Sequence, residues 1–217
     1  MMDYAAARQN MVESQLRPAG ISEATLLRAA AEIPREIFLE PEVRSTAYSE
    51  AAVCIAPGRF MLSPLSACWL LQGASIGQNE VVLVVGAGDG YMAALAAKLA
   101  STVIGLECDS ALAAHAALLF TQLGLDNIAM IEGELAAGDT RQAPFDVIIV
   151  NGAVEAGLDP LTAQLSDGGR LVCVQNENGA GQARLYRRDG DSVSSRPIRN
   201  ISAPLLTGFA KAKAFSF

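Results

Sequence analysis

The chain of 217 residues is 51% hydrophobic and 18% charged, which excludes a disordered protein and provides enough apolar material for a sizeable core. Its formal net charge of −7, from 16 basic and 23 acidic residues, and the lack of a lysine and arginine cluster argue against a nucleic-acid partner. No apolar run approaches the roughly 20 residues of a membrane span and no secretory signal pattern is present, so we expect a cytoplasmic protein without a membrane partner.

Four cysteines are scattered along the chain without a C-x-x-C pair, which favours neither a zinc site nor a redox dithiol, and we expect no metal. Each is predicted to be a small core residue in a reducing compartment, and three of the four have apolar neighbours on both sides. The four are Cys54, Cys68, Cys108 and Cys173.

The N-terminal third of the chain predicts helices around an irregular stretch. An amphipathic pattern predicts a helix over residues 3–17, and Ser22 is a plausible N-cap for a second helix. Residues 35–60 are rich in proline, glycine and isolated charges, which predicts irregular structure with a short strand at 52–55. A helical pattern returns over residues 63–73.

Strands and helices then alternate along the chain. The predicted strands are wholly apolar and rich in β-branched residues, which is typical of a parallel sheet covered by helices on both faces. These strands span residues 81–85, 102–106, 128–131, 147–150 and 170–174, and the helices between them span residues 92–99, 110–123 and 158–165. The alternation predicts an α/β fold with a doubly wound, mostly parallel sheet.

The end of the chain changes character. Residues 184–188 and 192–196 flank Asp189-Gly190-Asp191 and predict an antiparallel hairpin, and residues 210–217 predict a final strand. No internal repeat or linker divides the sequence. We therefore expect a single domain, residues 1–217, in which residues 1–75 form a helical, substrate-side region and residues 76–217 form the cofactor-binding core.

Three glycines at alternate positions follow the first predicted strand of this core. Gly86, Gly88 and Gly90 allow backbone conformations that a Cβ would block and let a ligand approach the main chain closely. A plain turn would also carry glycines, but Glu107 ends the next strand, where a carboxylate accepts ribose hydroxyl protons. Glu134 and Asn151 follow two further strands. Because ligands of open α/β sheets lie outside the carboxyl ends of the strands, the set predicts a nucleoside-type ligand.

The glycine spacing argues against a dinucleotide. The third glycine stands at the fourth position after the first, whereas G-x-G-x-x-G requires the fifth. Asp89 inside the loop would also repel a pyrophosphate and suits a cationic or zwitterionic ligand. S-adenosyl-L-methionine meets these conditions, because it carries ribose hydroxyls, a sulfonium and an amino-acid end.

Several segments resemble the protein-L-isoaspartate O-methyltransferase family over almost the whole chain. The opening helix Arg8-Gln9-Asn10-Met11-Val12-Glu13-Ser14-Gln15-Leu16 is similar to that of the family, and Ile33-Pro34-Arg35-Glu36-Ile37-Phe38 resembles its V-P-R-E-x-F segment. Ala47-Tyr48-Ser49-Glu50 resembles its A-Y-x-D, and the stretch from Val82 to Tyr91 resembles its V-L-E-I-G-T-G-S-G-Y. Pro144-Phe145-Asp146 and Gly168-Gly169-Arg170-Leu171-Val172 are similar to its later strands.

The resemblance implies a Rossmann-like class I methyltransferase fold with seven strands, an N-terminal helical cap and a C-terminal antiparallel hairpin. It also implies methyl transfer from S-adenosyl-L-methionine to the α-carboxylate of isoaspartyl residues in damaged proteins or peptides. That carboxylate is already ionised at neutral pH, so positioning and exclusion of water are the main requirements. The implied cofactor-binding residues are Gly86, Ala87, Gly88, Asp89, Gly90, Glu107, Cys108, Gly133, Glu134, Leu135 and Asn151.

The acceptor side departs from the family pattern. The family reads G-Q-T-I-S-x-P where this chain has Gly58-Arg59-Phe60-Met61-Leu62-Ser63-Pro64, so Leu62 takes the place of the active-site serine and Ser63 is the catalytic candidate one residue further. Tyr48 and Glu50 are assigned to the acceptor side by resemblance, and Arg59 is either an anion partner for an acceptor carboxylate or an exposed loop residue. His115, the only histidine, lies in a predicted helix among alanines and is expected to have a surface or packing role.

Four functions therefore remain open from the sequence: an isoaspartyl methyltransferase, a methyltransferase for another acceptor, a non-catalytic binder of the cofactor and, more remotely, a nicotinamide dehydrogenase. Leu62 and Asn151 favour the second, and the full-length resemblance favours the first. The sequence does not indicate an oligomeric state.

Overall fold

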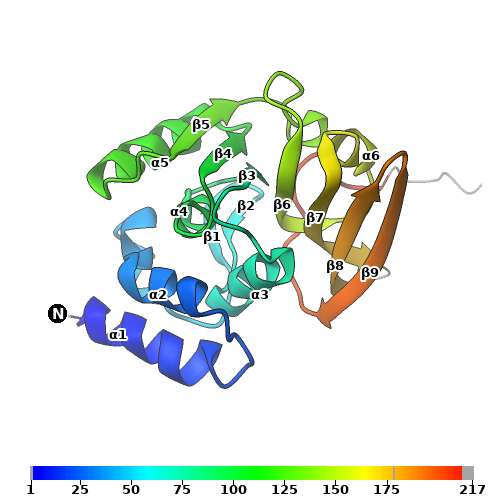
Figure 1. Ribbon diagram of the computed structural model, residues 1–217. Coiled ribbons are helices and arrows are strands. Elements are labelled where there is room, and N and C mark those ends of the chain that lie inside the picture. The colour runs from blue at the N-terminus through cyan, green and yellow to red at the C-terminus, as the bar shows by residue number, and fades with distance from the viewer. Residues whose placement is uncertain (1, 178, 212–217) are drawn as a thin grey trace, which may run out of the picture.

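A seven-stranded sheet runs through the computed structural model, which describes residues 2–177 and 179–211 (Figure 1). Its strand order is β5-β4-β3-β6-β7-β8-β9, parallel from β5 to β7 and antiparallel from β7 to β9. The strands are β3 (Val81–Val85), β4 (Thr102–Glu107), β5 (Ile128–Glu132), β6 (Phe145–Val154), β7 (Leu165–Glu177), β8 (Ala180–Asp189) and β9 (Ser192–Asn200). The predicted α/β class, the mostly parallel sheet and the C-terminal hairpin are confirmed.

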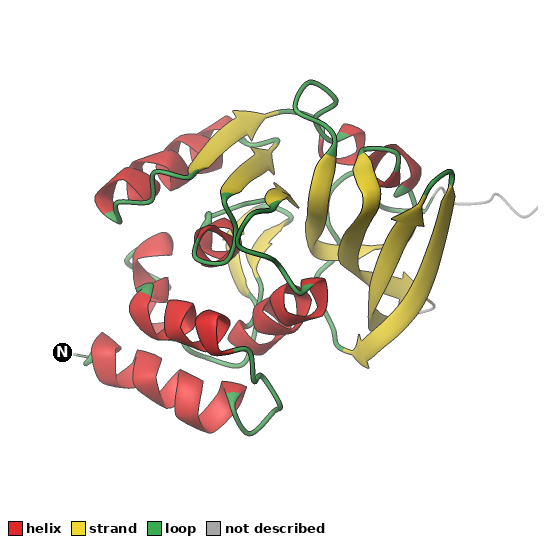
Figure 2. Cartoon of the chain, viewed as in Figure 1, coloured by secondary structure: helices red, strands yellow, loops and turns green. Residues whose placement is uncertain are grey.

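Helices cover both faces of the sheet, which explains why the central strands are apolar throughout (Figure 2). One apolar cluster joins the sheet to α4 (Tyr91–Ala97) and α5 (Ser110–Gln122), and the N-terminal helices extend it outward. These N-terminal helices are α1 (Tyr4–Asn10), α2 (Ala24–Glu32) and α3 (Pro64–Ala74). The second cluster lies on the opposite face, beneath the short α6 (Asp159–Thr162).

The chain reverses its direction across the sheet between β3 and β6. It runs outward from β3 through β4 to β5, and then returns to place β6 on the other side of β3. Connections that leave neighbouring strands in opposite directions open a crevice at the carboxyl ends, and this is where ligands of such sheets bind. The glycine loop after β3 lies at this point.

The N-terminal region differs from expectation in three details. The first helix is α1 followed by a π-helical stretch, Met11–Leu16. Glu23 rather than Ser22 is the N-cap of α2, because the Glu23 carboxylate accepts the Thr25 and Leu26 N–H groups. The short strand expected at 52–55 is present as β1 (Val53–Ala56), but the stretch predicted to be irregular also contains two 3₁₀ turns (Arg35–Phe38 and Arg44–Thr46) and β2 (Arg59–Met61), which pairs with β1 in a hairpin.

The C-terminal segment, residues 201–209, leaves β9 and returns along the carboxyl end of β6. The Ala153 N–H donates to the Pro204 carbonyl at 2.8 Å, and the Leu206 N–H donates to the Ala153 carbonyl at 2.8 Å. The strand predicted at 210–217 lies mostly outside the described residues, and Ala210 and Lys211, which are described, are not in a strand.

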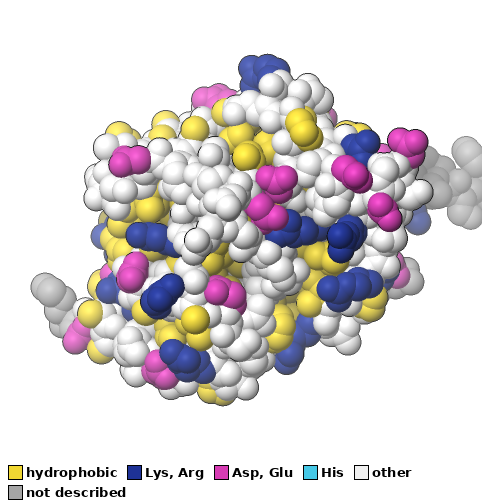
Figure 3. Space-filling model, viewed as in Figure 1, with side chains coloured by type: hydrophobic (Ala, Val, Ile, Leu, Met, Phe, Trp, Pro, Cys, Tyr) yellow, Lys and Arg dark blue, Asp and Glu magenta, His cyan; other side chains and the backbone are white. Residues whose placement is uncertain are grey.

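The surface bears on three expectations from composition. Cys68 and Cys173 are buried as predicted, whereas Cys54 and Cys108 are exposed, because Cys54 is on the outward face of β1 and Cys108 lies at a bend directly after β4. Basic and acidic side chains are interspersed on the face shown in Figure 3. Among the described residues, the helices are too short or too polar to cross a membrane.

Candidate active site

The glycine loop is held in place by its neighbours in the sheet. Gly86, Gly88 and Gly90 have φ values of 71°, 59° and 96°, in the left-handed region that glycine adopts without steric cost. The Gly86 and Ala87 N–H groups donate to the Leu106 carbonyl at 2.9 and 3.0 Å. From β6, the buried Asn151 amide donates to the Gly86 carbonyl at 3.0 Å. The loop is therefore fixed from both neighbouring strands.

Asp89 faces the protein interior. Its side chain is 3% exposed, and Oδ1 accepts the Tyr91 N–H at 2.7 Å, so it satisfies the first turn of α4. Burial raises the pKa of Asp89 to about 6, against the opposing effects of the Tyr91 N–H and of the Arg35 charge. A carboxylate placed in this way stabilises the loop and is directed away from a ligand in the crevice.

Glu107, at the end of β4, lies next to the loop as the sequence predicts, but its carboxylate is already fully hydrogen-bonded. It accepts backbone N–H groups from Gly88 at 2.7 Å, Cys108 at 2.9 Å and Asp109 at 3.1 Å. The Arg59 guanidinium supplies two further donors, Nε at 3.1 Å and Nη2 at 2.5 Å. A carboxylate offers about four lone-pair positions, so these five donors leave none for ribose hydroxyls.

The Arg59–Glu107 pair is buried. The two side chains are 6% and 0% exposed, and the two-pronged contact is the geometry that a guanidinium forms with a carboxylate. Burial alone would raise the pKa of Glu107, but the hydrogen bonds and charge of Arg59 outweigh it and hold that pKa below its ordinary value. Arg59 is therefore not the exposed loop residue of one expectation, and it pairs with a protein carboxylate instead of facing the acceptor side.

Two apolar side chains complete the cover over the loop. A Cβ added to Gly86 would lie 2.8 Å from Leu206 Cδ1 and 3.3 Å from Arg59 Nη2, and one added to Gly88 would lie 3.1 Å from Ile55 Cδ1. All five loop residues from Gly86 to Gly90 are buried. The arrangement therefore does not fit an adenosyl group against the loop, because Arg59, Ile55 and Leu206 fill the space that such a ligand needs.

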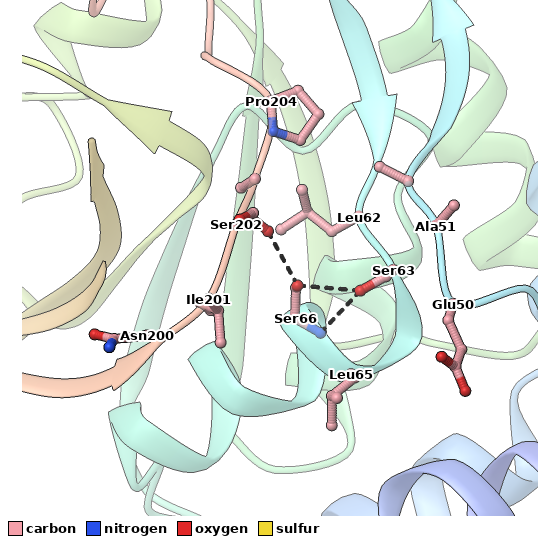
Figure 4. A pocket seen from close by; sticks show the side chains of 12 residues that line it. Glu50, Ala51, Leu62, Ser63, Leu65, Ser66, Asn200, Ile201, Ser202 and Pro204 are labelled. Atoms are coloured by element: carbon pink, nitrogen blue, oxygen red, sulfur yellow. Dashed lines mark hydrogen bonds between the residues drawn. The ribbon is translucent and has the colours of Figure 1, made fainter. Parts of the chain in front are cut away.

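An open cavity lies next to Leu62, which is one of the residues that line it (Figure 4). Its volume is about 600 Å³, and its walls come from residues 50–52, from the start of α3 and from residues 200–204. The Ser63 hydroxyl donates to Ser66 Oγ at 3.0 Å, and the Ser66 hydroxyl donates to the Ser202 carbonyl at 3.2 Å. Ser63 is also the N-cap of α3, since its Oγ accepts the Ser66 N–H at 3.1 Å.

The remaining candidates divide between these two areas and the surface. Glu50 is exposed and lines the open cavity with Ser63. Tyr48 is 7% exposed, and its hydroxyl donates to Glu36, so it supports the N-terminal region. The residues nearest Glu107 include Gly133, whose N–H donates to the Glu107 carbonyl at 3.1 Å, while Leu135 is buried and Glu134 is exposed.

Cys108 is exposed, and its Sγ lies 3.4 Å from Glu107 Oε1. Burial of the thiol and the charge of Glu107 raise the pKa of Cys108, so the thiol stays protonated at neutral pH. Cys108 lies beside Glu107, the predicted ribose-binding residue, because it directly follows Glu107 in the sequence. His115 is half-buried within α5, consistent with the packing role expected for it.

Sequence reasoning missed the C-terminal segment altogether. Leu206 covers the glycine loop and Ser202 reaches the serine pair, although both lie more than 100 residues from these partners in the sequence. The only sequence signal was the apolar stretch after β9, which carries no motif. Arg59 was identified as a candidate partner for an anion, but its pairing with Glu107 was not predicted.

The fold is that of class I methyltransferases. A solved structure titled protein-L-isoaspartate O-methyltransferase superposes with a TM-score of 0.79 at 22% identity, covering 93% of this chain and 66% of that chain. A second, titled a putative protein-L-isoaspartate O-methyltransferase from Plasmodium falciparum in complex with S-adenosyl-L-homocysteine, gives a TM-score of 0.77 at 17% identity and covers 95% and 99% of the two chains.

Sequence comparison is more specific. Residues 6–203 match the family described as protein-L-isoaspartate(D-aspartate) O-methyltransferase. A protein-L-isoaspartate O-methyltransferase of Roseiflexus castenholzii is 34% identical over 96% of each chain, and one of Methylorubrum populi is 36% identical over 95% of this chain and 98% of its own. The chain belongs to the protein-L-isoaspartate O-methyltransferase family.

Proposed function

We propose that the protein transfers a methyl group from S-adenosyl-L-methionine to the α-carboxylate of isoaspartyl residues in proteins or peptides. The observation that carries the proposal is the family match, which covers residues 6–203 and so includes the helical cap and the cavity as well as the cofactor core. Relatives of nearly equal length are named for this activity. One further inference from this role is that the chain acts in the cytoplasm, in protein repair.

The cofactor would supply the methyl group, and the loop from Gly86 to Gly90, with Glu107 and Asn151, is the proposed place for it. This assignment is supported by the position of these residues at the β3–β6 reversal. The proposed neighbours are Cys108, Gly133, Glu134 and Leu135. With Arg59 on Glu107 the crevice is filled, so this part of the proposal requires Arg59, Ile55 and Leu206 to move.

The acceptor is proposed to bind in the 600 Å³ cavity, which Glu50 and Ser63 line. An ionised acceptor carboxylate needs no base, so the cavity has only to hold it and exclude water. Glu50 is the only charged residue among those that line this cavity in the described part of the chain, and its negative charge disfavours a second carboxylate beside it. The hydroxyls of Ser63 and Ser66 are the proposed donors, which requires them to leave their present acceptors, Ser66 Oγ and the Ser202 carbonyl. Tyr48 is proposed to support this side of the site through its hydrogen bond to Glu36.

Labelled S-adenosyl-L-methionine and an isoaspartyl peptide test the proposal, with the normal aspartyl peptide as control. We expect label on the isoaspartyl peptide alone. Equal, background-level label on both peptides would contradict the activity. Leu62→Ser restores a hydroxyl at the position where the family has serine, and we expect it to raise the rate.

A second candidate is a protein that keeps the fold without the reaction. It is favoured by the closed crevice and by the buried Leu62, which is 3% exposed and has no hydrogen-bonding group. This candidate predicts no thermal shift with S-adenosyl-L-homocysteine. By contrast, a ligand at 100 times its Kd stabilises the native state by about 2.7 kcal/mol. Differential scanning calorimetry therefore separates the two.

A further inference from the structure

The space that family membership assigns to the adenosyl group is taken up by side chains of the chain itself. The Arg59 guanidinium forms a two-pronged contact with Glu107, and its Nη2 also lies within 3.6 Å of where a Cβ of Gly88 would be. A single cationic side chain thus contacts both the carboxylate and the glycine loop. These are the two features that would hold the ribose and the rest of the nucleoside.

We propose that Arg59 is an internal competitor of the cofactor, and that an adenosyl ligand binds only after Arg59 has left Glu107. The inference rests on the proposed function, because it concerns how the same site becomes available. It adds a residue that sets cofactor affinity from the β1–β2 hairpin, outside the sheet that carries the binding residues.

The position of Arg59 makes such an exchange physically reasonable. Arg59 is the first residue of β2, directly after the turn at Pro57 and Gly58, and β1 and β2 form a separate two-stranded sheet. Gly58 has a φ of 71°, and a Cβ there would meet only Thr207 Oγ1 within 4 Å, at 3.5 Å. A short hairpin of this kind can shift without breaking the ladder of the seven-stranded sheet.

The Glu107 carboxylate keeps three backbone hydrogen bonds when Arg59 is absent. The N–H groups of Gly88, Cys108 and Asp109 still donate to its two oxygens, so the carboxylate is not left unpaired. It would then have room for two hydroxyl donors in the positions that Nε and Nη2 occupy. Replacement of Arg59 should accordingly free the carboxylate for a ligand without unfolding the loop, while Ile55 and Leu206 still have to move aside in the wild type and the variant alike.

The size of the effect follows from the population of the open state. If the open form accounts for roughly 0.1 to 10% of molecules, the apparent Kd is raised by the inverse of that fraction. Arg59→Gln removes both the positive charge and the two-pronged contact with Glu107, and should therefore lower the Kd for S-adenosyl-L-homocysteine by roughly 10- to 1,000-fold. Arg59→Lys keeps the charge but has only one ammonium group, and should give an intermediate value.

Isothermal titration with S-adenosyl-L-homocysteine tests the inference on the wild type, R59Q, R59K and the control R17Q. Arg17→Gln also removes an arginine from an Arg–Glu pair, but that pair is exposed, at 53% and 49%. We expect the Kd to fall in the order wild type, R59K, R59Q, with R17Q equal to the wild type. Equal affinity of wild type and R59Q overturns the inference.

The titration separates this inference from the proposed function. Tight and equal binding with isoaspartyl methylation intact overturns the role of Arg59 alone, whereas no binding by any variant overturns both. A second readout does not depend on a folded variant. The ¹⁵N-edited signal of the Arg59 Nε–H should be protected from exchange in the ligand-free wild type and lost on saturation with S-adenosyl-L-homocysteine. A signal that is unprotected, or that persists unchanged at saturation, overturns the inference.

Discussion

Two regions at the carboxyl end of the sheet are built in opposite ways. Around Glu107 the polar groups are buried and paired, and side chains from distant segments fill the crevice. Around Ser63 a cavity of about 600 Å³ stays open, with hydroxyls and one exposed carboxylate on its walls. The comparison teaches that family membership locates a site but does not say whether its space is free. The region with the glycine motif, around Glu107, is the one whose space is filled.

The largest expected effect is on the buried pair of the closed region. Glu107→Gln leaves the Arg59 cation buried without an anion, and should lower the free energy of unfolding by about 3 to 5 kcal/mol at pH 7. The matched change Glu13→Gln acts on the exposed Arg17–Glu13 pair and should cost less than about 1 kcal/mol. Urea unfolding measures both. A similar decrease in the free energy of unfolding in the two variants would show that Glu107 is not a buried, ionised carboxylate.

The next effect concerns the loop glycine that packs against α5. Gly90 has a φ of 96°, and an added Cβ would lie 2.8 Å from Ala116 Cβ and 2.9 Å from Phe120 Cζ. Gly90→Ala combines backbone strain with overpacking and should cost about 3 kcal/mol in urea unfolding.

Gly124→Ala is its control. Gly124 has a φ of 63° and no atom within 4 Å of an added Cβ, so only the strain of about 1 kcal/mol remains. If both variants lose the same stability, the close packing of the loop on α5 is refuted.

Asp89 makes the stability of the closed region depend on pH. Its pKa is about 6 in the native state and 3.8 in the ordinary reference, so the native state holds the proton more tightly. Protonation therefore stabilises the fold as the pH falls through 6, and the gain levels off below 3.8. From pH 7.5 to 4.5 the wild type should gain about 2 kcal/mol relative to Asp89→Asn, which keeps the Tyr91 contact but cannot titrate. Parallel pH profiles of the two proteins would disprove the raised pKa.

The smallest effect belongs to the open region. Ser66→Ala removes the hydroxyl that joins Ser63 to the Ser202 carbonyl, and should cost about 1 kcal/mol. Ser45→Ala, at an exposed position, should change stability by less than about 0.5 kcal/mol. Thermal unfolding gives both values. A loss at Ser66 as large as that of Glu107→Gln would remove the contrast between the two regions.

Local patterns were sufficient for the sheet. Val81–Val85 was predicted with the bounds that the structure has, because a short apolar run between polar residues has few alternatives. Glu107 was placed correctly next to the glycine loop, since carboxyl ends of parallel strands share one edge. The N-cap of α2 was missed by one residue, because the longer Glu23 side chain, and not that of Ser22, accepts the first free N–H groups of the helix.

The partners in the crevice could not be predicted in this way. Arg59 and Glu107 are 48 residues apart, and nothing in either local sequence specifies the other. Leu206 belongs to a segment without a motif, whose path depends on backbone hydrogen bonds to Ala153. Cys54 was misplaced because alternate residues of a strand face opposite ways, so apolar neighbours on both sides do not indicate burial. Cys108 was misplaced because it lies at a bend directly after β4, between two acidic residues. Long-range contacts decide these features, and periodicity does not encode them.

The path of the C-terminal segment has a practical consequence for deletion studies. Residues 200–204 form a wall of the cavity, and Leu206, two residues further, lies on Gly86. A chain shortened after Asn200 would lose the cavity wall and Leu206 at once. An affinity tag fused close behind Phe209 would disturb the same segment. Domain-trimming experiments therefore cannot dissect the two regions, and only single-residue variants can.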